Sequence, residues 1–434
     1  MCKLKKHRAK MINFEKLLIA ILLLSIISCQ KSEERSEKKD DNIEQINGIQ
    51  IGISDRLNSG ILDQDRELLI YLPESAKDPS RKKEKYPVVY LLDGHYSFLP
   101  FVAMLKQYSE LNDTKILPEM IVIAIPNIDF NSRMMDFSPT TAGKPQQYGG
   151  GNKFLEFMST ELFPYIEKNY PVSDNRTIVG HSLGGAVVMN ALTSKPEMFD
   201  NYLMIDGSLS FDNELFLKNP NYTLNGMGLN DKKIFIAIAN TATFGSSLES
   251  IKKDSIRANN HARHSLELIK QIEHMETDLN MDWKYYENDT HGSTVYPAQK
   301  DGFRFFYPWF EFKKEHKYRS KYFIPKTKED RFVNLTKSHF EIISQKFGYN
   351  FKPEKQWVSS KAYMLLNFHK QPNQAKEVFE LNIDYYPNDA STYKDLADFY
   401  LSQKDSISAN KYYIKSLELD DNSQIREIVN KLGT

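Results

Sequence analysis

One serine in the sequence stands where a nucleophile would be expected. The stretch "RTIVGHSLGGAVVMN", residues 176–190, leads from an apolar, β-branched run through Gly180-His181-Ser182-Leu183-Gly184 into small residues that suit a helix start. In a G-x-S-x-G turn the serine sits between a strand and a helix, and its glycine neighbours leave room for that sharp bend. A serine hydroxyl attacks only when a base takes its proton. The stretch predicts Ser182 as a nucleophile, with the backbone N–H of Leu183 as one oxyanion donor.

The candidate base is a histidine near the end of the last predicted strand. His291 closes the run Asn288-Asp289-Thr290-His291 and follows Ser182 in chain order, as the base does in enzymes with this serine turn. His261 and His264 are three residues apart on a predicted helix, a spacing that could suit a metal. No acidic or cysteine cluster accompanies them in the sequence, so we predict a solvated helix face, no metal site and no cofactor.

The acid that would orient His291 is left open among three residues. It usually follows the seventh strand, and the loop there offers Asp254 and Glu249. Asp206, after the sixth strand, is an alternative. We rank Asp254 first, Glu249 second and Asp206 third, and a Ser-His dyad without a carboxylate also fits the sequence.

A second oxyanion donor is expected from the loop after the third strand. The residues there are Asp93-Gly94-His95-Tyr96. Gly94 allows a close backbone approach, and the N–H of His95 or Tyr96 would be the donor.

These residues need a sheet that brings strand ends together. Short apolar runs alternate with amphipathic segments, a pattern that predicts βαβ units and a mostly parallel sheet with an antiparallel edge at its start. In such a sheet, functional groups gather at the carboxyl ends of the strands. The predicted strands are 49–53, 67–72, 87–92, 120–126, 177–180, 202–205, 234–239 and 283–287, with helices at 154–169, 186–194 and 256–279.

Four motifs in this order resemble the putative-esterase branch of the α/β-hydrolases, which includes siderophore esterases, S-formylglutathione hydrolases and feruloyl esterases. They are "YPVVYLLDGHYSF", "IPNIDFNSRMMDFSPT", "IVGHSLGG" and "YYENDTHGSTVYPAQKDGFRFFY", and the resemblance covers roughly residues 47–312. It implies an α/β-hydrolase fold and a serine esterase that forms an acyl-enzyme on Ser182, with His291 as base. The small-molecule substrate would be a siderophore-type ester or an acyl or feruloyl sugar. Arg133 and Asp136 match an R-x-x-D-x-x-P stretch that borders the site, and we expect Asp93, Tyr96 and His181 to contact substrate as well.

The resemblance has limits. The siderophore subgroup often carries Ser-Pro-Ser and then Trp-Trp after the sixth strand, whereas this chain has Asp206-Gly207-Ser208-Leu209-Ser210-Phe211. That departure argues against aromatic contacts there and against a catecholate substrate. An acyltransferase of the same fold, or a non-catalytic scaffold that binds a partner through its C-terminal helices, are the alternatives.

The first 46 residues predict export and anchoring. Basic residues precede an apolar run at 17–27, which is shorter than the 20 or so residues needed to span a bilayer. The run ends in Ile26-Ile27-Ser28-Cys29, which resembles a lipobox. We therefore expect a signal peptide at 1–29, a lipid on Cys29 and a charged, disordered tether at 30–46. The chain would be an exported bacterial lipoprotein on a membrane facing the periplasm or the cell surface.

The last part of the chain repeats itself. Ala375 and Ala409 are 34 residues apart, as are Phe379 and Tyr413, a period that resembles tetratricopeptide repeats. We expect an esterase domain at 47–318 and a small all-α helical-repeat domain at 319–434. The helical domain would bind a protein partner, pack on the esterase domain or self-associate. The 434-residue chain has 57 basic and 57 acidic residues. It therefore lacks the excess positive charge of nucleic-acid-binding proteins, and we expect no nucleic-acid partner.

Overall fold

A computed structural model describes residues 50–433, apart from 79–80, 82–83, 112–114, 220–221, 225, 242–246, 254 and 257–258. Cys29 and Asp254 therefore lie outside the described residues. Residues 51–434 form one compact unit. Among the residues described, none of the helices has the length and apolar character needed to cross a membrane.

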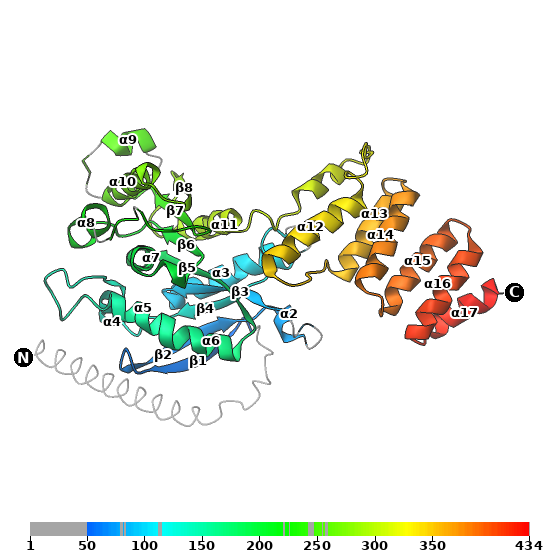
Figure 1. The fold of residues 1–434 in the computed structure, drawn as a ribbon, viewed down its shortest axis with the longest axis horizontal. Coiled ribbons are helices and arrows are strands. Elements are labelled where there is room, and N and C mark those ends of the chain that lie inside the picture. The colour runs from blue at the N-terminus through cyan, green and yellow to red at the C-terminus, as the bar shows by residue number, and fades with distance from the viewer. Residues whose placement is uncertain are drawn as a thin grey trace, which may run out of the picture. The chain divides into compact units, whose positions relative to one another are not determined.

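An eight-stranded sheet forms the centre of the α/β part, in the order β1-β2-β4-β3-β5-β6-β7-β8 (Figure 1). β1 pairs antiparallel with β2, and β2 with β4, while all other neighbours are parallel. The strands are β1 (Ile53–Ser59), β2 (Gln64–Tyr71), β3 (Tyr86–Leu92), β4 (Ile121–Ile125), β5 (Val172–His181), β6 (Asn201–Ile205), β7 (Lys233–Ala239) and β8 (Asn280–Tyr286). This arrangement confirms the predicted α/β class, including the antiparallel edge.

The first strand is displaced from its predicted position. The prediction of 49–53 shares only Ile53 with β1, which pairs with β2 from Ile53↔Ile70 to Ser59↔Gln64. β1 is a half-exposed edge strand in which polar residues predominate. An apolar run is therefore the wrong signal for it.

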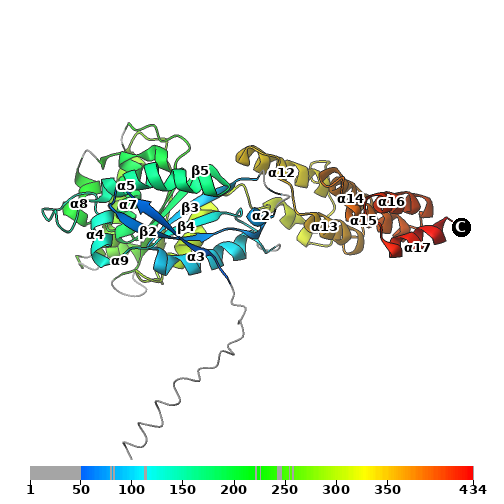
Figure 2. The ribbon, with the colours of Figure 1, turned by 90° about the horizontal axis from the view of Figure 1, so that it is seen from below.

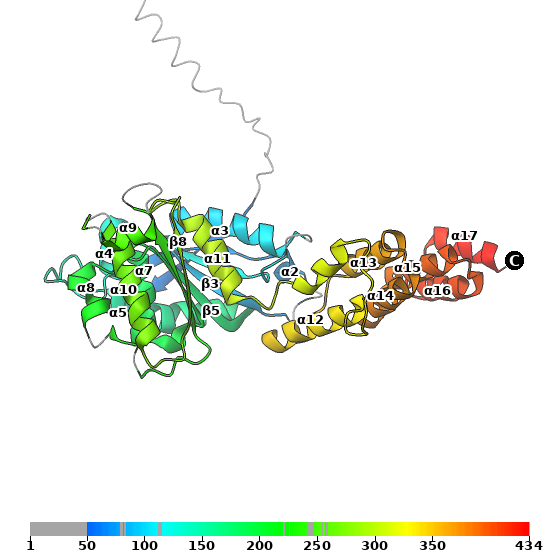
Figure 3. The same ribbon diagram turned by 90° about the horizontal axis from the view of Figure 1, so that it is seen from above.

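Helices cover both faces of the sheet. β3, β4 and β6 are buried along their whole length, as strands enclosed on both faces should be. α3 (Gly94–Ser109) and α11 (Val295–Phe306) cover one face together, and the rings of Phe101 and Phe303 meet there at 5.1 Å (Figure 3). The opposite face is covered by α5 (Gly151–Phe157), α6 (Phe163–Asn169), α7 (Leu183–Ser194) and α10 (Asn260–His274).

The shorter elements connect this framework. Residues 158–162 form a π-helical turn, η3 (Met158–Leu162), between α5 and α6. The remaining helices of the α/β part are α2 (Glu74–Lys77), α4 (Phe130–Phe137), η4 (Pro196–Met198), α8 (Phe211–Lys218) and α9 (Leu248–Lys253).

The strand order places two loops at a switch point. From β3 the chain moves outward to β4, then crosses back to β5 on the other side of β3. The carboxyl ends of β3 and β5 therefore open a crevice, where ligands bind in sheets of this kind. Asp93 follows β3 and Ser182 follows β5.

The C-terminal part of the chain is helical, as predicted. After η7 (Lys313–Arg319) it contains α12 (Phe332–Phe347), α13 (Lys355–Asn367), α14 (Pro372–Tyr385), α15 (Ala390–Ser402), α16 (Ser406–Leu419) and α17 (Ser423–Leu432), which follow one another from yellow to red in Figure 2. Two successive helix hairpins are formed by α13–α14 and α15–α16, and Ala375 and Ala409 lie on the second helix of each. Their assignment as tetratricopeptide repeats stays a prediction.

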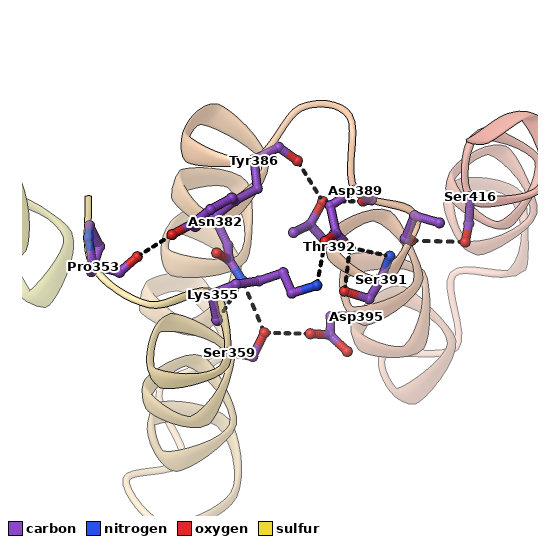
Figure 4. A network of polar contacts seen from close by, with 11 residues as sticks. Pro353, Lys355, Ser359, Asn382, Tyr386, Asp389, Ser391, Thr392, Asp395 and Ser416 are labelled. Atoms are coloured by element: carbon purple, nitrogen blue, oxygen red, sulfur yellow. Dashed lines mark hydrogen bonds and ion pairs between the residues drawn. The ribbon is translucent and has the colours of Figure 1, made fainter. Parts of the chain in front are cut away.

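A polar network joins the two hairpins (Figure 4). Asn382 on α14 is fully buried and donates to Ser359 Oγ on α13 at 2.9 Å. Ser359 in turn donates to the Asp395 carboxylate on α15 at 2.5 Å. Lys355 and Asp389 form an ion pair between residues 34 positions apart. The network therefore fixes one hairpin against the equivalent part of the next.

The helical part shares apolar packing with the sheet. Ile343 of α12 is buried in the apolar cluster on the α3 and α11 face, and Phe340, Phe347 and Phe351 pack against the same cluster. Lys115 also forms an ion pair with Glu354 at 2.5 Å. The predicted boundary between residues 318 and 319 falls inside η7. The residues of the helical part that pack against the sheet, 340–351, come after this boundary in the sequence.

Candidate active site

Ser182 occupies a strained turn between β5 and α7. Its φ of 58° and ψ of −119° are unusual for a side chain with a Cβ atom. The turn is held by its backbone, because Ser182 N donates to Ile205 O at 3.0 Å and Ser182 O accepts from Gly185 N and Ser208 N at 2.9 Å each. Such strain persists only where the surroundings enforce it, and it is typical of functional sites.

Gly180 makes this turn sterically possible. A Cβ atom on Gly180 would lie 2.1 Å from Gly184 O and 2.4 Å from Gly184 C, so the strand and the new helix touch backbone to backbone. A Cβ on Gly184 would meet only ordinary contacts, the nearest being Asp93 Oδ2 at 3.5 Å. Of the two glycines in the motif, Gly180 is the one that close packing demands.

Two N-terminal helix ends approach Ser182. Leu183 is the first residue of α7, and Gly94 is the first residue of α3. A Cβ on Gly94 would lie 2.8 Å from Pro126 N, so this loop is pressed against the end of β4. First-turn N–H groups lack partners within their own helix and carry the positive end of its dipole. Tyr96 N is already used, since it donates to Asp93 O at 3.1 Å, which leaves His95 N as the better donor of the two expected.

His291 lies against a carboxylate that the sequence ranked third. His291 Nδ1 is 2.5 Å from Asp206 Oδ2, across 85 residues of chain. Asp206 follows β6 with a φ of 42°, its side chain is fully buried, and its Oδ1 accepts from Ala239 N at 3.1 Å. Nδ1 therefore carries the proton toward Asp206, and the lone pair of Nε2 faces away from it.

Glu249, the second-ranked candidate acid, does not contact His291. Glu249 is on α9, is largely exposed, and pairs with Lys252 at 3.3 Å. Asp254 lies outside the described residues. Of the two ranked acids that the structure describes, only Asp206 is in contact with the histidine.

His181 supports His291 from the other side. Its Nε2 donates to the main-chain oxygen of His291 at 2.8 Å, and the two rings lie 4.3 Å apart. Burial, reinforced by the nearby His291, lowers the pKa of His181 to about 4. His181 therefore stays neutral at ordinary pH and holds the His291 loop, a role different from the substrate contact we expected.

Ser208, which we did not predict as part of the site, is a neighbour of Ser182. Its Oγ lies 3.4 Å from Ser182 Oγ, which is the one hydrogen-bond contact of that hydroxyl within the described part of the chain. A direct bond from Ser182 to His291 is not formed in this conformation. Such bonds commonly tighten only when substrate binds.

Asp93 and Arg133 form a charged pair near the crevice. Arg133 Nε and Nη2 donate to the two Asp93 oxygens at 2.6 and 2.9 Å, and Asn127 Nδ2 adds a third bond at 2.6 Å. Asp93 is therefore occupied with fixing Arg133 rather than free for substrate. Tyr96, by contrast, is 86% exposed and open to a ligand.

Asp136 does not border the site, contrary to expectation. It is buried and forms an ion pair with Arg66 of β2, which is also buried. The inward face of α4 meets the sheet at this point, so Asp136 neutralises a buried guanidinium. The aspartate of the R-x-x-D-x-x-P stretch therefore stabilises the fold and does not contact the candidate active site.

A large cavity lies elsewhere. It has a volume of about 530 Å³ and is lined by residues of both the α/β part and the helical part, among them Arg81, Glu119, Arg304, Phe312 and Trp357. None of the candidate catalytic residues lines it. We place the reaction centre by the geometry around Ser182 and His291, not by this cavity.

Several known proteins are similar to this chain. A family model described as putative esterase matches residues 59–265. A ferri-bacillibactin esterase, BesA, of Bacillus subtilis is 31% identical over 199 residues, which make up 42% of this chain and 66% of that protein, just under two thirds. A siderophore enterobactin esterase of Emericella nidulans is 26% identical over 247 residues, or 50% of this chain and 80% of that protein. The crystal structure of an IroE-like serine hydrolase from Shewanella oneidensis is similar with a TM-score of 0.55 and 27% identity, covering 77% of this chain and 99% of that one.

Proposed function

Because the chain belongs to the putative-esterase branch of the α/β-hydrolases, we propose that it hydrolyses a carboxylic ester with Ser182 as nucleophile. The observation that supports this most is the contact of His291 Nδ1 with the buried Asp206 carboxylate, since it leaves Nε2 as the proton acceptor. The order Ser, acid, His along the chain is also that of α/β-hydrolases.

The mechanism would run in two steps. Ser182 Oγ attacks the ester carbonyl carbon while His291 Nε2 takes its proton, and the backbone N–H groups of Leu183 and His95 donate to the developing oxyanion. His291 then gives the proton to the departing alcohol, leaving an acyl group on Ser182. A water molecule, deprotonated by His291, releases the acid and restores the serine. Asp206 stabilises the imidazolium in both steps without taking its proton.

We propose a siderophore-type ester as the substrate class, because the named relatives are esterases of siderophores. Tyr96, in the first turn of α3, is 86% exposed, so aromatic surface is available there to a substrate with aromatic or alkyl parts. This supports a siderophore ester over a small acetyl sugar. Anchoring through Cys29 remains part of the same proposal, and it would be tested by palmitate labelling of the wild type and a Cys29→Ala variant.

The esterase proposal is tested with the full-length protein and p-nitrophenyl acetate. We expect hydrolysis by the wild type and a loss of about 10⁴-fold or more in Ser182→Ala. Ser194→Ala is the matched control, because Ser194 is an exposed serine at the far end of the same helix. Full activity in Ser182→Ala would contradict the mechanism. An added alcohol that captures the acyl group faster than water would identify an acyltransferase instead.

A further inference from the structure

A second histidine stands beside the Asp206–His291 pair and has no part in the proposed reaction. His261 lies in the first turn of α10, and its Nδ1 is 3.3 Å from the Asp206 main-chain oxygen. Its ring centroid is 5.3 Å from that of His291. One ring nitrogen of each histidine and one Asp206 carboxylate oxygen all lie within 4.8 Å of one another. We propose that Asp206, His261 and His291 bind one Zn²⁺ ion that inhibits the esterase.

The tautomer of His261 favours binding of a cation. A main-chain oxygen can only accept, so His261 Nδ1 carries the proton toward Asp206 and Nε2 keeps its lone pair. Histidines that bind metal commonly donate their other N–H to a backbone carbonyl, which fixes the ring and makes the ligating nitrogen more basic. His261 has this arrangement already.

The ligand set selects the kind of ion. Two imidazole nitrogens and one carboxylate suit Zn²⁺, whereas Mg²⁺ and Ca²⁺ prefer oxygen ligands. The oxygen available is Asp206 Oδ2, because Oδ1 is held by Ala239 N. The His291 side chain is 39% exposed, which gives the ion a path of entry and room for a water as fourth ligand. The ion would be an inhibitor of this site, not a cofactor of the reaction.

Zinc binding would remove the base from the proposed reaction. The ion would displace the proton that His291 Nδ1 holds toward Asp206 Oδ2, and these two atoms would move apart from their 2.5 Å separation so that each can bond zinc at about 2.0–2.2 Å. A neutral imidazole carries a single proton, so that proton moves to Nε2. With Nε2 protonated, His291 cannot accept the proton of Ser182. The inhibition therefore rests on the proposed function, whereas the binding of the ion does not.

The test measures zinc binding and esterase activity separately, on the full-length protein. By calorimetry, we expect the wild type to bind one Zn²⁺ per chain. In the esterase assay, saturating zinc should lower activity at least about tenfold, EDTA should restore it, and Mg²⁺ at the same concentration should have no effect. His261→Gln should keep its activity without zinc within about twofold and need at least about tenfold more zinc for inhibition and for binding.

Two further variants make the result specific. His264→Gln is the matched control, because His264 lies one turn along the same helix and faces Glu214, 3.7 Å away. It should bind zinc like the wild type. Ser182→Ala should also bind zinc like the wild type while remaining inactive, so a failed esterase proposal would leave the binding result interpretable. The proposal is overturned if the wild type binds no zinc by calorimetry, or if His261→Gln binds zinc as tightly as His264→Gln.

Discussion

Replacing Asp206 with asparagine tests the assignment of the acid most directly. The substitution keeps the shape of the side chain and removes its charge. Ala239 N donates to Oδ1 at 3.1 Å, so the carbonyl oxygen of an asparagine amide would take that position. Its NH₂ group would then face His291 Nδ1, where the carboxylate oxygen now accepts at 2.5 Å.

The expected loss follows from this reversal. An NH₂ group donates to Nδ1, so the histidine proton is forced onto Nε2, and the ring no longer serves as a base. In serine proteases the equivalent change lowers kcat by about 10⁴, or about 5.5 kcal/mol at 1.36 kcal/mol per tenfold. We expect Asp206→Asn to lower kcat/KM by about 10³- to 10⁴-fold with the melting temperature little changed, as measured by p-nitrophenyl acetate hydrolysis and thermal unfolding.

Matched variants at the other two candidates sharpen the result. Glu249 is exposed and paired with Lys252, so Glu249→Gln should stay within about twofold of the wild type, in keeping with the small worth of surface ion pairs. Asp254→Asn should behave in the same way. Retention of more than a tenth of the activity in Asp206→Asn, with a large loss in either control, would refute the reasoning.

Three other outcomes are expected. Gly180→Ala should lower the free energy of unfolding by about 3 kcal/mol or more and abolish activity, because its Cβ would lie 2.1 Å from a backbone oxygen. Gly228 has open space around it, so the control Gly228→Ala should change the free energy of unfolding by no more than about 0.5 kcal/mol, as measured by urea unfolding. Asp136→Ala should cost about 3–5 kcal/mol in the same measurement, since it leaves Arg66 buried without its partner. Burial lowers the pKa of His339 to about 4. Between about pH 6.5 and pH 4 this histidine is therefore protonated in the unfolded chain but neutral in the folded protein, so the free energy of unfolding decreases as the pH falls through this range. His339→Gln should flatten that decline by about 1–2 kcal/mol between pH 7 and pH 5, as followed by urea unfolding at each pH.

Each of these has a contrary outcome. Equal stability of the two glycine variants would mean that the backbone at the turn can yield. An unchanged protein after loss of the Asp136 carboxylate would mean that water reaches the guanidinium. A pH profile that His339→Gln leaves unaltered would assign the acid sensitivity to another group, such as His181.

The turn around Ser182 and the central sheet could be predicted from the sequence, because both depend on local patterns. Gly180 and Gly184 around Ser182 mark the turn, and buried apolar runs mark the inner strands. The helix α3 was not predicted, since Pro100 and the aromatic residues at its start conceal the helical period. Long-range packing overrides such local signals.

The contacts of Asp206 with His291 and with His261 could not be predicted from the sequence. Asp206 reaches His291 only because the chain turns at φ 42° directly after β6, across a distance of 85 residues in sequence. His261 lies beside Asp206 because α10 packs over the sheet. The two residues are 55 positions apart in the sequence, so their spacing gives no sign of this contact. Both depend on where loops and helices settle in space, which residue types and spacing do not specify.

The shared packing of α12 also affects the order in which the newly made chain can complete its fold. Phe310 emerges from the ribosome about 40 residues before Phe351, although both belong to the same apolar cluster. At about 5–20 residues per second, this leaves one face of the sheet incomplete for about 2–8 seconds. Throughout that interval Ser182 and His291 have already been synthesised. The helical part therefore supplies the last piece of the apolar core on this face of the sheet.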